Sequence, residues 1–209
     1  ILSVGLKSGA SDIHLKAGLP PIYRIDGTLR PLPKAPRISP EQTEQIAAEI
    51  MNDMQRERFE TSYECDLAYG VPGLGRFRVN AFTQRGSISL VFRAIPFDIK
   101  DLDDLMLPPV IKKMAMAQRG LILVTGATGS GKSTTLAAVI DYINANRKAH
   151  IVTIEDPIEF LHRDKKSIIN QREVGSDTKG FEPALKSALR QDPDVILVGE
   201  MRDHETIET

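Results

Sequence analysis

The sequence is poor in cysteine and aromatic residues and has no long apolar run. Among 209 residues there is one cysteine and no tryptophan, and aromatic residues make up 5%. A single cysteine excludes an internal disulfide and a cysteine-rich zinc site, and we interpret Cys65 as a small, half-buried apolar residue. No apolar run approaches the roughly 18 residues of a membrane span. We therefore expect no transmembrane helix and at most a peripheral contact with a membrane.

An excess of charge of one sign is also absent. The sequence has 27 Lys and Arg against 28 Asp and Glu, which gives a formal net charge of −1, and it contains no long basic block. Because neutralising nucleic-acid phosphates needs clustered Lys and Arg, we expect no nucleic-acid partner. The histidines are at positions 14, 150, 162 and 204. They lack metal-ligand spacing, so we interpret them as structural or surface residues.

The most informative stretch is Gly126–Ser133, which fits the phosphate-loop pattern G-x-x-x-x-G-K-S known as Walker A. The apolar run 120–125 before it predicts a buried parallel strand. Residues 133–144 after it place apolar side chains at helical spacing. The motif therefore lies in the strand–loop–helix context that phosphate binding needs.

This motif predicts a role for each of its residues. Lys132 should reach the β- and γ-phosphates of a nucleotide, and Ser133 should ligate Mg²⁺. Glycines let backbone N–H groups turn inward toward an anion. The predicted nucleotide-binding residues of the loop are Gly126, Thr128, Gly129, Ser130, Gly131, Lys132, Ser133 and Thr134.

Two acidic clusters follow predicted strands. The strand at 150–154 ends in Glu155–Glu159, and the strand at 194–198, which should be buried, ends in Gly199–Asp203. Ligands bind at the carboxyl ends of strands in open α/β sheets. Glu200 is the candidate Walker B acid and would hold Mg²⁺ through water, whereas Glu155 and Glu159 are candidates for polarising water. The alternative for any one of them is a solvated carboxylate.

Residues 1–100 predict an α+β arrangement. Alternation predicts a strand at 11–16, and Asp26-Gly27 predicts a two-residue hairpin turn. Ser39, Pro40 and Gln42 predict a helix start with a capping box. A second short helix should be capped by Asp53 and run to Phe59, followed by strands at 64–70, 75–84 and 87–95.

Three arginines of these strands are candidate ligand residues. In the middle strand, Phe77, Val79 and Ala81 should face a core, so Arg76 and Arg78 should face outward. Arg76, Arg78 and Arg93 form either a solvated sheet face or a face that meets phosphate or an acidic surface.

The sequence divides into an N-terminal domain at 1–97, a linker at 98–107 and a second domain at 108–209. The second domain should begin with a helix from Pro108-Pro109 to about Gln118, and residues 180–190 predict a further helix. Residues 101–209 supply three or four strands, fewer than is usual for an open α/β sheet. We therefore expect an α/β protein whose second domain is incomplete within these residues.

Several motifs resemble the type IV pilus and type II secretion ATPase superfamily. The phosphate loop, the acidic box at 154–159 and the stretch 192–203 are similar to that superfamily. A closer resemblance, to its pilus retraction ATPases, is carried by the segments 11–21, 24–27, 76–82 and 170–174.

This resemblance implies a PAS-like N-terminal domain, a RecA-like ATPase domain and a ring-shaped homohexamer. It implies ATP and Mg²⁺ as cofactors and nucleotide contacts from N-terminal arginines. The catalytic residues would be Glu159, Lys132 and Glu200, the last as the Walker B glutamate. It also implies a motor for pilus retraction and twitching motility at the cytoplasmic face of the bacterial inner membrane, with a pilus platform protein as partner. The family extends beyond the segments found here, which agrees with an incomplete second domain.

Three alternatives remain open. The first is a pilus-extension or type II secretion ATPase. The second is a nucleotide-binding scaffold that does not hydrolyse ATP, although such a module has less use for both Glu159 and Glu200. The third is a small-molecule kinase, which would need an acceptor pocket.

Overall fold

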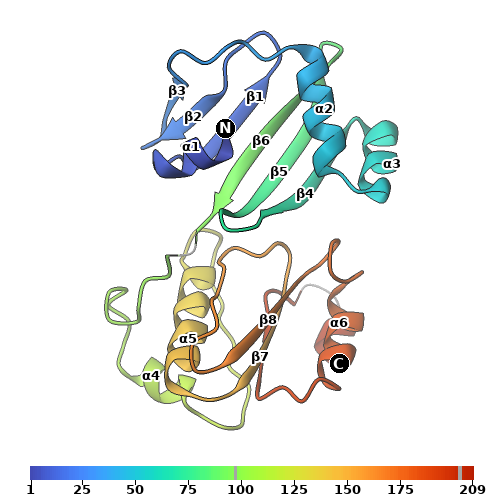
Figure 1. The fold of residues 1–209 in the computed structure, drawn as a ribbon. Coiled ribbons are helices and arrows are strands. Elements are labelled where there is room, and N and C mark those ends of the chain that lie inside the picture. The colour runs from blue at the N-terminus through green and yellow to red at the C-terminus, as the bar shows by residue number, and fades with distance from the viewer. Residues whose placement is uncertain (97, 202–203) are drawn as a thin grey trace. The chain divides into compact units, whose positions relative to one another are not determined.

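The computed structural model describes residues 1–96, 98–201 and 204–209. It contains two compact units, Ile1–Ile95 and Pro96–Thr209 (Figure 1). Both units combine helices with a sheet, so the chain is a mixed α/β protein. None of the helices in the described ranges combines the length and the apolar character that crossing a membrane requires.

The first unit is a six-stranded antiparallel sheet with three helices (Figure 1). The strand order is β3-β2-β1-β6-β5-β4. The helices contribute apolar side chains to the core on one sheet face. The elements are α1 (Leu2–Lys7), β1 (Asp12–Lys16), β2 (Ile22–Ile25), β3 (Thr28–Pro31), α2 (Pro40–Ile50), α3 (Asp53–Ser62), β4 (Glu64–Val71), β5 (Gly75–Gln84) and β6 (Ser87–Ile95).

Alternation along β5 decides which face is buried, as predicted. Phe77, Val79 and Ala81 are all 0% exposed. Phe77 packs edge-on against Phe92 of β6, with ring centroids 6.2 Å apart. The predicted strands and the hairpin at Asp26-Gly27 are confirmed in position. Cys65 was predicted to be half-buried but is fully buried in this core, and burial raises the pKa of its thiol.

The opposite face of this sheet carries charged residues. The pairing register places Arg24, Asp12, Arg93 and Arg78 side by side on β2, β1, β6 and β5. Asp12 is buried, and Arg93 Nε donates to its Oδ1 at 2.8 Å. Arg78 is exposed and Arg76 is half-buried. The outward direction predicted for the β5 arginines is therefore confirmed.

Both longer helices of the first unit begin with a capping box. Ser39 Oγ accepts from Gln42 N, and the Gln42 side chain accepts from Ser39 N. The second helix has the same reciprocal pair between Asn52 and Gln55. The predicted cap at Asp53 is therefore wrong by one residue, because the Asn52 amide oxygen already satisfies the exposed N–H group.

The second unit is built on a three-stranded parallel sheet with the order β8-β7-β9. Helix α5 packs on one face through Ile140 and Ile143, and α6 packs on the other through Ala184 and Ala188. The elements are α4 (Val110–Ala115), α5 (Lys132–Asn146), β7 (His150–Glu155), β8 (Ile168–Glu173), α6 (Phe181–Ala188), β9 (Val195–Val198) and α7 (His204–Glu208).

Two strand predictions for this unit need correction. Residues 121–127 form no strand with any described residue, and Leu121 and Leu123 are 80% and 59% exposed. A strand needs a neighbour to complete its backbone hydrogen bonds, and the described residues supply none beside this segment. Strand β9 is half-buried along its length, not buried as predicted. Helix α4 is also shorter than predicted.

Helix α5 ends close to a buried amide that holds the following chain. Asn144 is 0% exposed. Its Nδ2 donates to the Arg163 carbonyl at 2.7 Å, and its Oδ1 accepts from Lys165 N at 3.0 Å. The end of the helix is thus tied to the segment that leads into β8.

Candidate nucleotide-binding site

The phosphate-loop sequence forms the turn that enters α5. Gly129 and Gly131 have φ values of 80° and 90°, a left-handed region that favours glycine. A Cβ at Gly126 would lie 2.7 Å from Ser130 Oγ, so the serine side chain would have to move, and the φ of 156° also favours glycine there. Lys132 Nζ donates to the carbonyls of Gly126 and Ala127 at 2.9 Å each. The lysine head therefore lies over the loop, beside the N-terminus of the helix.

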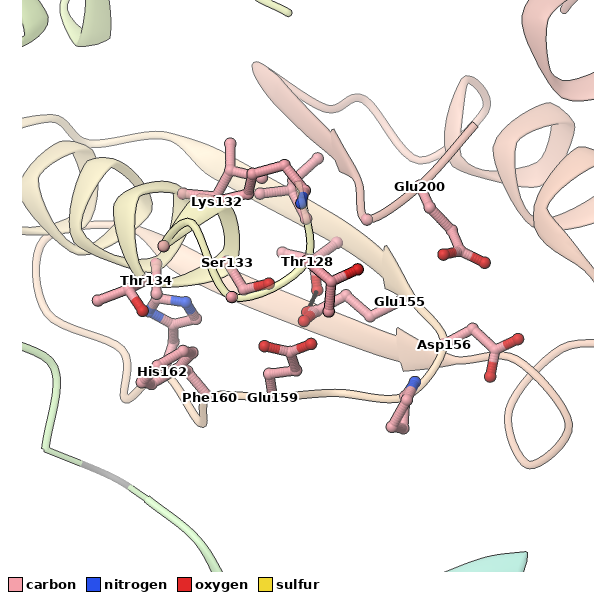
Figure 2. Close-up of a pocket in the computed structure, with 18 residues that line it drawn as sticks. Thr128, Lys132, Ser133, Thr134, Glu155, Asp156, Glu159, Phe160, His162 and Glu200 are labelled. Carbon is pink, nitrogen blue, oxygen red and sulfur yellow. Dashed lines mark hydrogen bonds between the residues drawn. The ribbon is translucent and has the colours of Figure 1, made fainter. Parts of the chain in front are cut away.

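A cavity of about 440 Å³ lies against this loop, within the size range of small-ligand sites. Figure 2 shows the Glu159 carboxylate below Ser133. Glu200 lies on the other side of Thr128 from Ser133 in this view. The carboxyl ends of β7 and β9 thus face the phosphate loop. The cavity is lined by Thr128, Gly129, Gly131, Lys132, Ser133, Thr134, Leu136, Ala137, Thr153, Glu155, Asp156, Pro157, Glu159, Phe160, His162, Leu197, Gly199 and Glu200.

Gly199 lets the ends of β7 and β9 approach closely. A Cβ at this position would lie 3.2 Å from the Ile154 carbonyl oxygen and 3.3 Å from Glu155 Cα. Both of these atoms belong to backbone, which cannot move aside as a flexible side chain can. The absence of a side chain at Gly199 therefore helps to keep Glu200 near Glu155.

Glu155 is a half-buried acid of the cavity. Burial raises the pKa of its carboxyl, although hydrogen bonds from Thr153, Gln171 and the Glu159 backbone act in the opposite direction. Thr153 Oγ1 donates to Glu155 Oε1 at 2.6 Å, and Gln171 Nε2 donates to the same oxygen at 3.1 Å. Perturbed carboxylates in cavities are typical of functional sites.

The residues present fit a nucleotide with Mg²⁺. The loop supplies backbone N–H groups and Lys132 for phosphate, and Ser133 and Glu200 line the same cavity. Within the described ranges, no group of three or more His, Cys, Asp or Glu side chains is arranged to hold a metal. Mg²⁺ would therefore take most of its ligands from phosphate and water, which is its usual behaviour beside nucleotides.

Most of the predicted site residues come together at this cavity. Gly126 and Ser130 do not line it, but they shape the loop. Arg76, Arg78 and Arg93 belong to the first unit, so their contact with a nucleotide stays a prediction. Arg202 and Asp203 of the acidic stretch, and Phe97 at the predicted domain boundary, lie outside the described residues.

Some lining residues were not predicted. Thr153, Phe160 and His162 all line the cavity, although His162 was interpreted as a structural or surface residue. Burial lowers the pKa of the His162 imidazole. The sequence signal for Phe160 and His162 was their place directly after the acidic box, which puts them on the same segment as Glu159.

A phosphate loop at a helix N-terminus, facing acidic strand ends of a parallel sheet, is the arrangement of a P-loop nucleotide-binding protein. The family model described as type II/IV secretion system protein matches residues 1–209, and the chain belongs to this family as a PilT/PilU-like member.

Two curated relatives come from Pseudomonas aeruginosa. The type IV pilus retraction ATPase PilT is 54% identical over 207 residues, which cover 99% of this chain and 60% of PilT. The type IV pilus ATPase PilU is 47% identical over 208 residues, which cover 100% of this chain and 54% of PilU. The chain therefore spans a little over half the length of these relatives.

A crystal structure of the pilus retraction motor PilT with bound ADP has a similar fold. It is 52% identical to this chain, with a TM-score of 0.89. The match covers 100% of this chain and 62% of that one.

Proposed function

We propose that the protein containing this chain hydrolyses ATP to ADP and phosphate, and that it uses this reaction to drive pilus retraction. The observation that carries the proposal is the cavity itself. It brings Lys132 and Ser133 of the phosphate loop together with Glu159 and Glu200, which follow two neighbouring parallel strands.

Each residue has a distinct task in this proposal. Lys132 and the loop amides hold the phosphates and offset their charge, while Ser133 and, through water, Glu200 hold Mg²⁺. The metal, when bound, neutralises charge that develops on the phosphate oxygens. Glu159 orients the attacking water and accepts its proton. The protein thus contributes mainly positioning and electrostatics, as is usual in phosphoryl transfer.

The retraction role is supported by the relatives, since PilT is described as a pilus retraction ATPase and matches the chain along its length. We infer a PAS-like first domain, a RecA-like ATPase domain and a homohexameric ring. The ring would act at the cytoplasmic face of the inner membrane, on a pilus platform protein. Arg76, Arg78 and Arg93 would approach the nucleotide, and rigid-body motion between domains would transmit the work.

The test is phosphate release from ATP by the complete protein. Lys132→Ala should lower kcat/KM at least about a hundredfold because phosphate contacts are lost. Glu159→Gln should lower kcat by a similar factor, with ADP affinity retained because the phosphate loop is intact. Lys148→Ala, which removes an exposed lysine of the same unit, is the matched control and should have wild-type turnover.

The alternatives predict other results. ATP binding without phosphate release would favour a scaffold, and phosphate transfer to an acceptor other than water would favour a kinase. A deletion strain that lacks pili, in place of one with excess pili, would favour an extension or secretion ATPase. Unchanged turnover in Lys132→Ala would remove the basis of the proposal.

A further inference from the structure

We propose that Gln171 and Glu173 of β8 are positioning residues that hold the acidic segment 156–162 and thereby aim Glu159 into the cavity. The inference deepens the proposed function and rests on it, because it concerns a site that we assign to ATP hydrolysis. Neither residue lines the cavity, so neither would contact the nucleotide itself.

Gln171 joins two parts of the site through its side-chain amide. Its Nε2 donates to Glu155 Oε1 at 3.1 Å and to the Phe160 carbonyl at 2.9 Å. Its Oε1 accepts from His162 N at 2.8 Å. One amide group therefore fixes the carboxylate at the end of β7 and two backbone groups of the acidic segment.

Glu173 contacts the same segment two residues farther along β8. Its Oε2 accepts from Ile158 N at 3.0 Å, and the residue is 5% exposed. Because side chains alternate along a strand, Gln171 and Glu173 lie on one face of β8. The parallel register places them opposite Thr153 and Glu155 of β7.

Together these contacts anchor every second residue from Ile158 to His162. Ile158 N, Phe160 O and His162 N all bond to β8 side chains. Glu159 lies between two of the anchored residues and is exposed at the cavity. A carboxylate that orients water must be held in place, since a shift of about 1 Å can cost roughly a hundredfold in rate. The anchors supply that constraint together with one backbone hydrogen bond, from Leu161 N to the Pro96 carbonyl at 3.2 Å.

The main test compares turnover with nucleotide affinity in the complete protein. Gln171→Met keeps length but loses all three hydrogen bonds. We expect kcat to fall about tenfold to a hundredfold, with KM for ATP and Kd for ADP within about threefold of wild type because the phosphate loop is intact. Gln171→Glu keeps the acceptor for His162 N but loses the amide donor. Its kcat should therefore be little higher than that of Gln171→Met.

Glu173 offers a conservative rescue. Glu173→Ala removes the acceptor for Ile158 N and should lower kcat, whereas Glu173→Gln keeps a carbonyl oxygen in that place and should recover most of it. Asn170→Ala is the matched control. Asn170 precedes Gln171 in β8, and its side chain bonds to His150, away from the acidic segment. This variant should have wild-type kcat.

Amide hydrogen exchange tests the anchors independently of turnover. In Gln171→Met the His162 amide should exchange at least about tenfold faster, and in Glu173→Ala the Ile158 amide should do so. Absence of phosphate release in the wild type would refute the proposed function, while exchange would still report on the anchors. The positioning proposal is overturned if Gln171→Met keeps kcat within twofold of wild type, or loses ADP affinity as much as rate.

Discussion

Asp12 of the first unit and Glu155 of the second are carboxylates partly or wholly removed from solvent, and the two units treat this charge differently. In the first unit, burial alone would raise the pKa of Asp12, but hydrogen bonds from Arg93 and Ser11 outweigh it and the pKa is lowered. In the second unit, Glu155 accepts from a hydroxyl and an amide, both neutral, and burial raises its pKa. A structural carboxylate is paired with a cation, whereas a raised pKa beside a cavity is typical of a group with a further task.

The two units also differ in how the N-termini of their helices are capped. Helices α2 and α3 are capped by the side chains of Ser39 and Asn52. Helix α5 has Gly131 at its N-cap position and no side-chain cap. A helix N-terminus without a cap offers its N–H groups to an anion. The two longer helices of the first unit thus use side chains to satisfy N–H groups at their N-termini, whereas α5 leaves such groups for a ligand.

The largest effect should come from the apolar core of the first unit. Phe77→Ala removes a fully buried ring and its edge contact with Phe92. We expect the free energy of opening at β5 and β6 to fall by about 3–5 kcal/mol. Hydrogen exchange measures this quantity. Met54→Ala, at a side chain that is 75% exposed, is the control and should stay within about 0.5 kcal/mol of wild type.

In the second unit, we expect a buried amide side chain to contribute to stability. Asn144→Ala leaves the Arg163 carbonyl and the Lys165 N–H without this partner. We expect unfolding of this unit to require about 1–3 kcal/mol less free energy. Asn146→Ala is a close control, because Asn146 is exposed on the same helix and bonds only locally to Tyr142. Equal losses in the two variants would contradict the importance of Asn144.

A smaller effect is expected at the helix start of the first unit. Ser39→Ala removes the acceptor for Gln42 N and should destabilise this unit by about 1 kcal/mol. Ser39→Asn keeps a capping oxygen and should recover nearly all of that loss. Denaturant titration of both variants checks the expectation, and a loss in Ser39→Asn as large as in Ser39→Ala would contradict it.

The smallest expected effect is on the pH dependence of stability, which should have opposite signs for Asp12 and Glu155. The native pKa of Asp12 lies below its usual 3.8, so its contribution to stability is present above that value and is lost as pH falls through the native pKa. The native pKa of Glu155 lies above its usual 4.5, so its contribution falls as pH rises from that value through the native pKa.

Neutral variants separate these two contributions. Asp12→Asn should lower the stability of the first unit at neutral pH. It should also make that stability less dependent on pH in the acid range. Glu155→Gln should raise the stability of the second unit at neutral pH when no nucleotide is bound. Unfolding measured from pH 3 to pH 8 tests both signs, and the same sign for both variants would contradict the comparison.

Local patterns were sufficient for much of this architecture. The capping box at Ser39, the Asp26-Gly27 turn and the alternation of β5 depend on neighbours close in sequence, and all three were predicted. The segment 120–125 was predicted wrongly, since strand formation depends on a partner and not on apolar composition alone.

Contacts between segments that are far apart in the sequence could not be predicted from sequence patterns. Gln171 reaches the Phe160 carbonyl, and Asn144 reaches the Arg163 carbonyl, because the fold brings these segments together. An amide side chain gives no sign of such partners in the sequence. The phosphate loop was recognisable, whereas the groups that support the acidic segment emerged with the structure.

The exposed segment before the phosphate loop has a practical consequence for handling the chain. Leu121, Ile122 and Leu123 are 80%, 46% and 59% exposed, and no described strand covers them. In a purified sample of residues 1–209, this exposed apolar segment would promote self-association of the chain. Light scattering should therefore show particles that grow with protein concentration, and storage at low concentration should keep the sample usable for longer.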